Sequence, residues 1–170
     1  MNVPSGNLDN LDRSVGRSAF GIDANGYHDA RSGYPDELFA DLTRLTAPNP
    51  RILEIGAGTG LATQGLLTLA PRRLTLVEPD PRLCDFLQDR FSFSGSNVVC
   101  GAFPDAAVAG QFDLIACAAA FHWMEPVAAL ARIRQLLAPG GTWTMWWNCY
   151  FGHGEPDPFG DRISQIFEAI

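Results

Sequence analysis

Apolar residues between positions 34 and 147 follow two alternating patterns. Short apolar runs, typical of strands buried on both faces, alternate with longer segments in which apolar residues recur every three or four positions, as on one face of a helix. The helical segments begin near Pro35, residue 60, Pro81 and Pro126. The strands are expected at residues 51–55, 74–77, 97–100, 112–117 and 142–147.

The limits of three helices can be predicted from single residues. Asp80 is expected to cap the helix that begins at Pro81, because its carboxylate can accept a backbone N–H of the first turn. The first and last of these helices should end at prolines or glycines, at Pro48 and at Pro139-Gly-Gly141. Their buried faces are expected to hold Leu38, Leu42 and Leu45 in the first helix, and Leu130, Ile133 and Leu137 in the last.

Strands that alternate with helices at this spacing predict right-handed β-α-β units. The expected fold class is therefore α/β, with a doubly wound (Rossmann-like), mostly parallel sheet and helices on both faces. Such sheets bind ligands beyond the carboxyl ends of their strands, at the point where the strand order reverses. Candidate functional residues should therefore follow the strands directly.

A glycine-rich loop follows the first expected strand. The segment Glu54-Ile-Gly56-Ala-Gly58-Thr-Gly60 places three alternating glycines between a strand and a helix, where the backbone can turn tightly and approach a ligand without Cβ clashes. Glu78 stands at the end of the second strand, where a carboxylate can accept hydrogen bonds from both hydroxyls of a ribose. Together these features predict a site for a nucleoside-containing cofactor.

The loop and Glu78 resemble those of the class I S-adenosylmethionine-dependent methyltransferases, especially the small-molecule branch with trans-aconitate-type and ubiquinone-biosynthesis-type enzymes. Other segments resemble this family in the same order along residues 20–148. They are Phe20-Gly21 with Tyr27-His-Asp-Ala-Arg31-Ser-Gly-Tyr34-Pro35, Phe112-Asp113-Leu-Ile, Ala120-Phe-His-Trp123 and Leu136-Leu-Ala-Pro139-Gly-Gly141.

The resemblance implies S-adenosyl-L-methionine as cofactor, S-adenosyl-L-homocysteine as product, and methyl transfer to a small-molecule O, N or C nucleophile. It places Glu54 near the cationic methionine end of the cofactor and Glu78 at the ribose. Tyr27 and Arg31, four residues apart, would lie near the cofactor carboxylate on an arm that closes over it. The remaining cofactor contacts are expected at Gly56, Ala57, Gly58, Gly60, Pro79, Ala102, Phe103 and Ala119.

His122 is the candidate catalytic residue, because it directly follows the fourth strand. It could hydrogen-bond the substrate or act as a general base, or it could pack the turn together with Trp123. Two positions depart from the family pattern. Ser32 replaces a usual proline, and Pro104 stands where relatives often carry an acidic residue near the adenine, a role that Asp105 could take by a one-residue shift.

Two other functions stay open at this stage. The chain could be a catalytically inactive S-adenosylmethionine-binding module or a truncated enzyme remnant. It could also be a dinucleotide-dependent oxidoreductase, although dinucleotide loops usually read GxGxxG and Leu61 stands where their third glycine would be.

The net charge and the distribution of apolar residues and cysteines restrict the classes of partner, location and metal site that we expect. A formal net charge of −7 disfavours a nucleic-acid partner, since phosphate backbones are bound by clustered Lys and Arg. No apolar run approaches a membrane span and the polar N-terminus is no signal peptide, so the expected location is cytoplasmic. The cysteines at positions 84, 100, 117 and 149 form no metal pattern and are expected to be buried, reduced thiols.

The expected division is an N-terminal arm and cofactor-capping segment, residues 1–35, followed by a cofactor-binding core, residues 36–170. The family resemblance implies the strand order 3-2-1-4-5 and two further C-terminal strands, six and seven, which we do not find in the sequence. The fifth strand would then form an uncharged sheet edge. We expect either that the core is truncated at its C-terminus or that a partner, such as a second copy in a homodimer, covers this edge.

Overall fold

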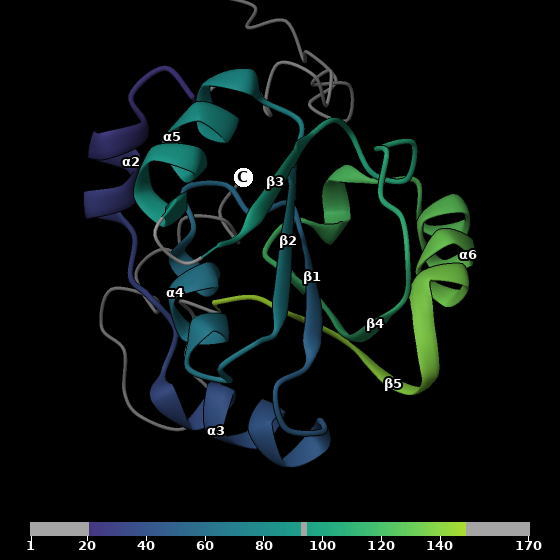
Figure 1. Ribbon diagram of the computed structural model, residues 1–170. Coiled ribbons are helices and arrows are strands. Elements are labelled where there is room, and N and C mark those ends of the chain that lie inside the picture. Colours follow the sequence, from purple (N-terminus) through teal and green to yellow (C-terminus); the bar gives the residue numbers. More distant parts are fainter. Residues whose placement is uncertain (1–20, 93–94, 149–170) are drawn as a thin grey trace, which may run out of the picture.

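The computed structural model describes residues 21–92 and 95–148. Five strands form one sheet in the order β3-β2-β1-β4-β5, and every neighbouring pair is parallel (Figure 1). The expected fold class and strand order are thus confirmed. The strands are β1 (Arg51–Ile55), β2 (Arg73–Glu78), β3 (Asn97–Cys100), β4 (Phe112–Ala118) and β5 (Leu137–Trp146).

Helices cover both faces of the sheet, and α6 lies on the opposite side from α3, α4 and α5 (Figure 1). Alternate residues of β1 serve the two layers: Leu53 and Ile55 pack with α6, whereas Ile52 packs with α3, α4 and α5. This alternation follows from the period of two in a strand. The helices are α2 (Ala24–Ala30), α3 (Asp36–Leu45), α4 (Leu61–Leu67), α5 (Pro81–Phe91) and α6 (Pro126–Leu136), with a short 3-10 helix η3 (Phe121–Trp123).

Several local predictions are confirmed. The limits predicted for β1 and β3 match the structure, and the Asp80 side chain accepts a hydrogen bond from the Arg82 backbone N–H at 3.0 Å, as expected of a helix cap. The predicted helix faces are partly wrong. Leu130 and Leu45 are 45% and 62% exposed, and α6 instead buries Ala129, Ile133 and Leu136.

Strand β5 begins earlier than predicted. It starts at Leu137 rather than at Thr142, and the Pro139-Gly-Gly141 segment that predicted a helix stop lies within it. The register explains how proline is accommodated, because Phe112 pairs with Leu137 while Leu114 pairs with Thr142, so residues 138–141 bulge out of the ladder. Within the described residues β5 pairs with β4 alone.

An ion pair joins the amino ends of β1 and β4. Arg51 donates from Nε and Nη2 to the two carboxylate oxygens of Asp113, at 2.9 and 2.6 Å, and its backbone N–H donates to the same group at 2.8 Å. These hydrogen bonds lower the pKa of Asp113 to about 2. The pair lies at the end of the sheet opposite to the glycine loop and holds the central strands in register.

Some predictions fall outside the described residues. These are residues 1–20 of the N-terminal segment and residues 149–170 of the expected core, including Cys149. Of the other cysteines, Cys84 and Cys117 are buried and unpaired as expected, whereas Cys100 is exposed. In the described part of the chain no helix is both long enough and apolar enough to span a membrane.

Candidate functional site

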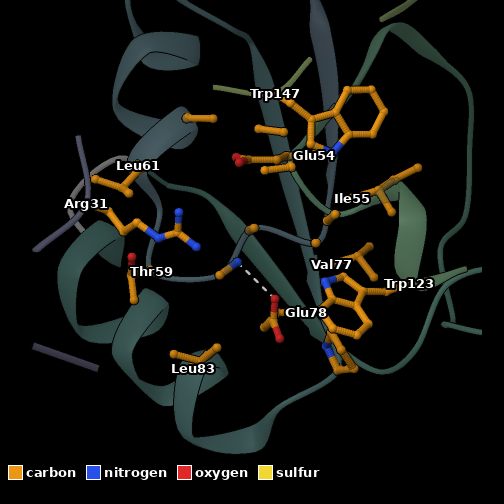
Figure 2. A pocket seen from close by; sticks show the side chains of 18 of the residues that line it. Arg31, Glu54, Ile55, Thr59, Leu61, Val77, Glu78, Leu83, Trp123 and Trp147 are labelled. Carbon is orange, nitrogen blue, oxygen red and sulfur yellow. Dashed lines mark hydrogen bonds between the residues drawn. The ribbon is translucent and has the colours of Figure 1, made fainter. Parts of the chain in front are cut away.

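A cavity of about 380 Å³ lies at the carboxyl ends of β1, β2 and β4. This is the point where the strand order reverses, since β2 lies on one side of β1 and β4 on the other. Residues of α2 and of the segment after it, together with Trp147 and Asn148, which follow β5, complete the walls. Figure 2 shows Glu54, Glu78, Arg31, Trp123 and Trp147 around this space.

The three glycines of the loop serve different purposes. All have positive φ angles, of 72°, 57° and 81° at Gly56, Gly58 and Gly60, a region that glycine occupies at little cost. A Cβ at Gly56 would overlap the Cβ of Ala120, so this glycine allows the loop to approach the segment after β4. A Cβ at Gly58 would meet no atom within 4 Å, although Gly58 lines the cavity.

The third glycine of the loop, Gly60, has different surroundings from the other two. Gly60 is not among the described residues that line the cavity, and a Cβ there would overlap the ring of Phe91 on α5. Its function in the structure is therefore close packing between the loop and α5. That Gly60 also contacts the cofactor stays a prediction.

The Glu78 carboxylate ends β2 and is bonded to the glycine loop. Its Oε2 accepts the Gly58 N–H at 2.9 Å, drawn as the dashed line in Figure 2, and its Oε1 accepts the Asp80 N–H at 3.1 Å. The backbone N–H groups of Gly56 and Ala57 also donate to the Val77 carbonyl, at 2.8 and 3.1 Å. These bonds fix the position of Glu78 at the cavity wall, and each carboxylate oxygen has two lone pairs with which to accept hydrogen bonds.

Glu54 is a buried carboxyl group at the cavity wall, with 1% of its surface exposed. Burial raises its pKa to about 8, the negative charge of Glu78 adds to this rise, and the Thr63 hydroxyl, which donates to Oε2 at 2.6 Å, opposes it. At pH 7 the group is therefore mostly protonated. A positive charge beside it would stabilise the ionised form.

The α2 segment brings Tyr27 and Arg31 to the cavity. The Arg31 guanidinium lies 5.2 Å from the centroid of the Tyr27 ring, so the two residues share a face as their spacing predicted. His28, to which the sequence assigned no function, links this segment to the glycine loop through a contact of 3.1 Å between Nδ1 and the Thr59 hydroxyl. Burial, followed by the charge of Arg90, lowers the pKa of His28.

His122 lies on η3 and lines the cavity, as predicted. Its ring stands 4.7 Å from the Trp123 ring, and its Nδ1 lies 3.3 Å from the indole nitrogen of Trp147. An indole N–H can only donate, so Nδ1 must be the acceptor and the neutral imidazole carries its proton on Nε2. The contact with Trp147 therefore favours a hydrogen-bond donor at Nε2.

Every other predicted cofactor contact also lines the cavity. These are Ala57, Pro79, Ala102, Phe103 and Ala119, whereas Asp105 is not among the lining residues. Sequence reasoning did not name several more lining residues as site residues, since most of them are apolar and their place at the cavity depends on how distant segments come together. They are Ser32, Tyr34, Ile55, Thr59, Leu61, Ala62, Val77, Leu83, Ala118, Ala120, Trp123, Met124, Trp147 and Asn148.

Comparison with known families agrees with this geometry. The profile of the family described as "Methyltransferase domain" matches residues 53–143, more than half of the chain. The chain belongs to this methyltransferase family. The match covers the glycine loop, Glu78, His122 and most of the sheet.

This methyltransferase domain is also similar in sequence to individual proteins. An uncharacterised methyltransferase-like protein of Schizosaccharomyces pombe is 30% identical over 158 residues, which cover 86% of this chain and 57% of that protein. The chain therefore spans less than two thirds of the length of this relative.

Two solved structures share the fold. The N-methyltransferase NodS of Bradyrhizobium japonicum, in complex with S-adenosyl-L-homocysteine, aligns with a TM-score of 0.63 and 22% identity over 78% of this chain and 71% of NodS. The glycopeptide N-methyltransferase MtfA, in complex with S-adenosyl-L-methionine, aligns with a TM-score of 0.57 and 19% identity over 66% of this chain and 54% of MtfA.

Proposed function

We propose that this methyltransferase domain binds S-adenosylmethionine and transfers its methyl group to a small-molecule O, N or C nucleophile. The observation that carries the proposal is the hydrogen bond between Glu78 and the Gly58 N–H at the wall of the cavity, since it joins the acidic strand end to the glycine loop. Structural neighbours that were solved with S-adenosylmethionine or S-adenosylhomocysteine support the same cofactor.

The residues present suit the parts of this cofactor. Glu78 would accept the ribose hydroxyls, and the apolar surface of Ala102, Phe103 and Leu83 would contact the adenine. The buried Glu54 would face the positively charged methionine end, and Arg31 would attract its carboxylate. We retain residues 1–35 as a cofactor-capping segment on the strength of Tyr27 and Arg31, which reach the cavity from α2.

The bound cofactor would supply a sulfonium whose methyl group is electrophilic. The residues of the chain would align a nucleophile with the methyl group and exclude water. This is catalysis by proximity and orientation. Trp123, Met124 and Trp147 supply apolar surface at the cavity for this purpose. His122, with its proton on Nε2, would orient the acceptor through a donated hydrogen bond.

Titration calorimetry tests the cofactor assignment. We expect S-adenosylmethionine and S-adenosylhomocysteine to bind with one site per chain and NAD to give no heat of binding. Tight NAD binding without a response to S-adenosylmethionine would contradict the proposal and favour an oxidoreductase. Binding without methyl transfer to any acceptor in a broad panel would instead favour a non-catalytic cofactor-binding module.

Cofactor affinity is expected to depend on the protonation of Glu54. Its pKa is about 8 in the structure, and a cation beside it lowers this value, so binding releases a proton and strengthens as pH rises toward 8. We expect S-adenosylhomocysteine to bind about tenfold more tightly at pH 7.5 than at pH 6.0, a window below the range of about 7.7–8.0 in which α-amino groups lose their proton.

The Glu54→Gln variant is the matched reference for this measurement, because an amide oxygen can still accept the Thr63 hydroxyl but cannot ionise. Its affinity should be lower and nearly independent of pH in the same window. An unchanged pH dependence in the variant would assign the effect to another group in the cavity, such as His122, and would remove Glu54 from the methionine end.

Replacing His122 with alanine is expected to lower kcat by about tenfold or more while changing the cofactor dissociation constant by less than about threefold. The His122→Gln variant distinguishes the two chemical functions, because a glutamine amide can donate a hydrogen bond but cannot act as a base at neutral pH. Donation predicts partial activity in His122→Gln. Equal loss of turnover and cofactor binding in His122→Ala would favour a packing function.

A further inference from the structure

A second depression adjoins the cavity. It has a volume of about 400 Å³ and we refer to it as the acceptor groove. Four of its residues also line the cavity, so the two spaces share a wall: Ser32, Tyr34, Trp147 and Asn148. The remaining residues of the acceptor groove in the described part of the chain are Gly33, Pro35, Leu38 and Trp146.

The walls of the acceptor groove come from two separate parts of the chain. One wall is the segment between α2 and α3 with the first turns of α3, and the other is the end of β5. Trp146 is fixed between Tyr34 and Phe39, with edge contacts of 5.8 and 6.4 Å between ring centroids. The Asn148 amide donates to the Ser32 carbonyl at 3.4 Å and so connects the two walls.

The chemistry of the acceptor groove contrasts with that of the cavity. The cavity holds Glu54, Glu78 and Arg31, whereas none of the eight described residues that line the groove carries a charged side chain. A charged group that left water for this groove would find no ion partner on these residues, which is costly. An uncharged hydrocarbon or aromatic body would bury its surface against Pro35, Leu38 and Trp146 and gain free energy.

We propose that the acceptor groove binds the uncharged, apolar body of the methyl acceptor, whose nucleophilic atom extends past Trp147 into the cavity. This inference rests on the proposed methyltransferase function and adds to it the chemical class of the acceptor. The shared wall of the two spaces supports it, because Trp147 lines both and its indole N–H contacts His122, the residue proposed to orient the acceptor.

Two fluorescent probes that differ by one charge test the proposal. N-phenyl-1-naphthylamine is neutral, and 8-anilino-1-naphthalenesulfonate adds a sulfonate to the same ring body. On the protein saturated with S-adenosylhomocysteine, the neutral probe should bind at least about tenfold more tightly than the anionic one. In a second titration, S-adenosylhomocysteine is added to cofactor-free protein that already holds the neutral probe, and the probe should remain bound.

Substitutions locate the probe. Leu38→Glu introduces a charge into the acceptor groove and should weaken binding of the neutral probe by about tenfold, with the affinity for S-adenosylhomocysteine unchanged within about twofold. Leu45→Glu makes the same change at a residue of the same helix that is 62% exposed and does not line the groove, and it should have no effect. Gly33→Asp is a second groove variant, since a Cβ at Gly33 meets no atom within 4 Å and the fold should tolerate it.

The outcomes separate the two proposals. If S-adenosylhomocysteine fails to bind, the proposed function is wrong and the acceptor assignment falls with it. If S-adenosylhomocysteine binds but the neutral probe does not bind, or is displaced by S-adenosylhomocysteine, the groove assignment alone is wrong. Equal binding of the neutral probe to the wild type and to both groove variants would also overturn the groove assignment.

Discussion

Replacing Gly58 with valine is expected to abolish S-adenosylmethionine binding while the domain stays folded. The φ angle of Gly58 is +57°, a conformation that a β-branched residue adopts only with strain of about 1–3 kcal/mol. The added side chain would also occupy open space at a residue that lines the cavity, where the protein backbone is expected to lie against the cofactor. We expect a loss of affinity of more than about 100-fold by calorimetry, since the side chain would exclude the cofactor, whereas the backbone strain mainly lowers the stability of the fold.

Gly140→Val provides the matched control for this variant. Gly140 also has a positive φ angle, +76°, and open space around its ideal Cβ, but it lies in the bulge of β5 and does not line the cavity. Both variants should lose similar thermal stability, and only Gly58→Val should lose binding. Unchanged cofactor affinity in Gly58→Val would mean that the loop serves only as a turn between β1 and α4.

Glu78→Ala is expected to weaken cofactor binding by about 1.5–3 kcal/mol, or about 10- to 150-fold, which is the usual range for hydrogen bonds to a charged group. The substitution removes the proposed acceptor of the ribose hydroxyls and also the partner of the Gly58 N–H. Calorimetry with S-adenosylhomocysteine measures the loss, and circular dichroism at increasing temperature checks the fold.

Glu37→Ala is the control for the change of charge, because Glu37 is exposed in the first turn of α3 and does not line the cavity. It should leave the cofactor affinity unchanged within about twofold, as substitutions of exposed residues outside a binding site usually do. A Glu78→Ala protein that is folded and binds as tightly as the wild type would remove Glu78 from the proposed ribose site.

Much of the fold could be predicted from the sequence because local patterns and sheet topology agree. The apolar runs of β1 and β3 have clear limits, and the prediction that Glu54, Gly58 and Glu78 belong to one site follows from their places at or just after strand ends. Parallel β-α-β connections bring these ends to one edge of the sheet, so their proximity follows from topology alone.

The remaining features depend on contacts between segments that lie far apart in the sequence. Gly60 packs against Phe91, and only the placement of α5 reveals that this glycine serves packing. The early start of β5 required a bulge that lets Pro139 lie outside the ladder, whereas the local sequence indicates a stop. Trp147 contacts His122 and so joins the residue after β5 to the turn after β4, and no local pattern indicates a contact between these two segments.

Strand β1 carries an ion pair near one end and a buried carboxyl group near the other. At its amino end the Arg51–Asp113 pair is ionised, and the lowered pKa of Asp113 means that its stabilising effect is present above pH 3.8 and is lost as the pH falls through about 2. Near its carboxyl end Glu54 holds a proton at neutral pH. Neither Arg51 nor Asp113 is among the groups that shift the pKa of Glu54, and Glu54 is not among the groups that shift the pKa of Asp113.

The two ends of this strand can therefore be altered independently. A substitution in the Arg51–Asp113 pair would lower the stability of the fold near neutral pH and would reduce the part of that stability that is lost in acid, without changing the pKa of the Glu54 carboxyl group at the cavity. A substitution of Glu54 would in turn leave the acid tolerance of the sheet intact. The pH dependence of the domain's stability and its affinity for a ligand at the cavity can therefore be changed by separate substitutions.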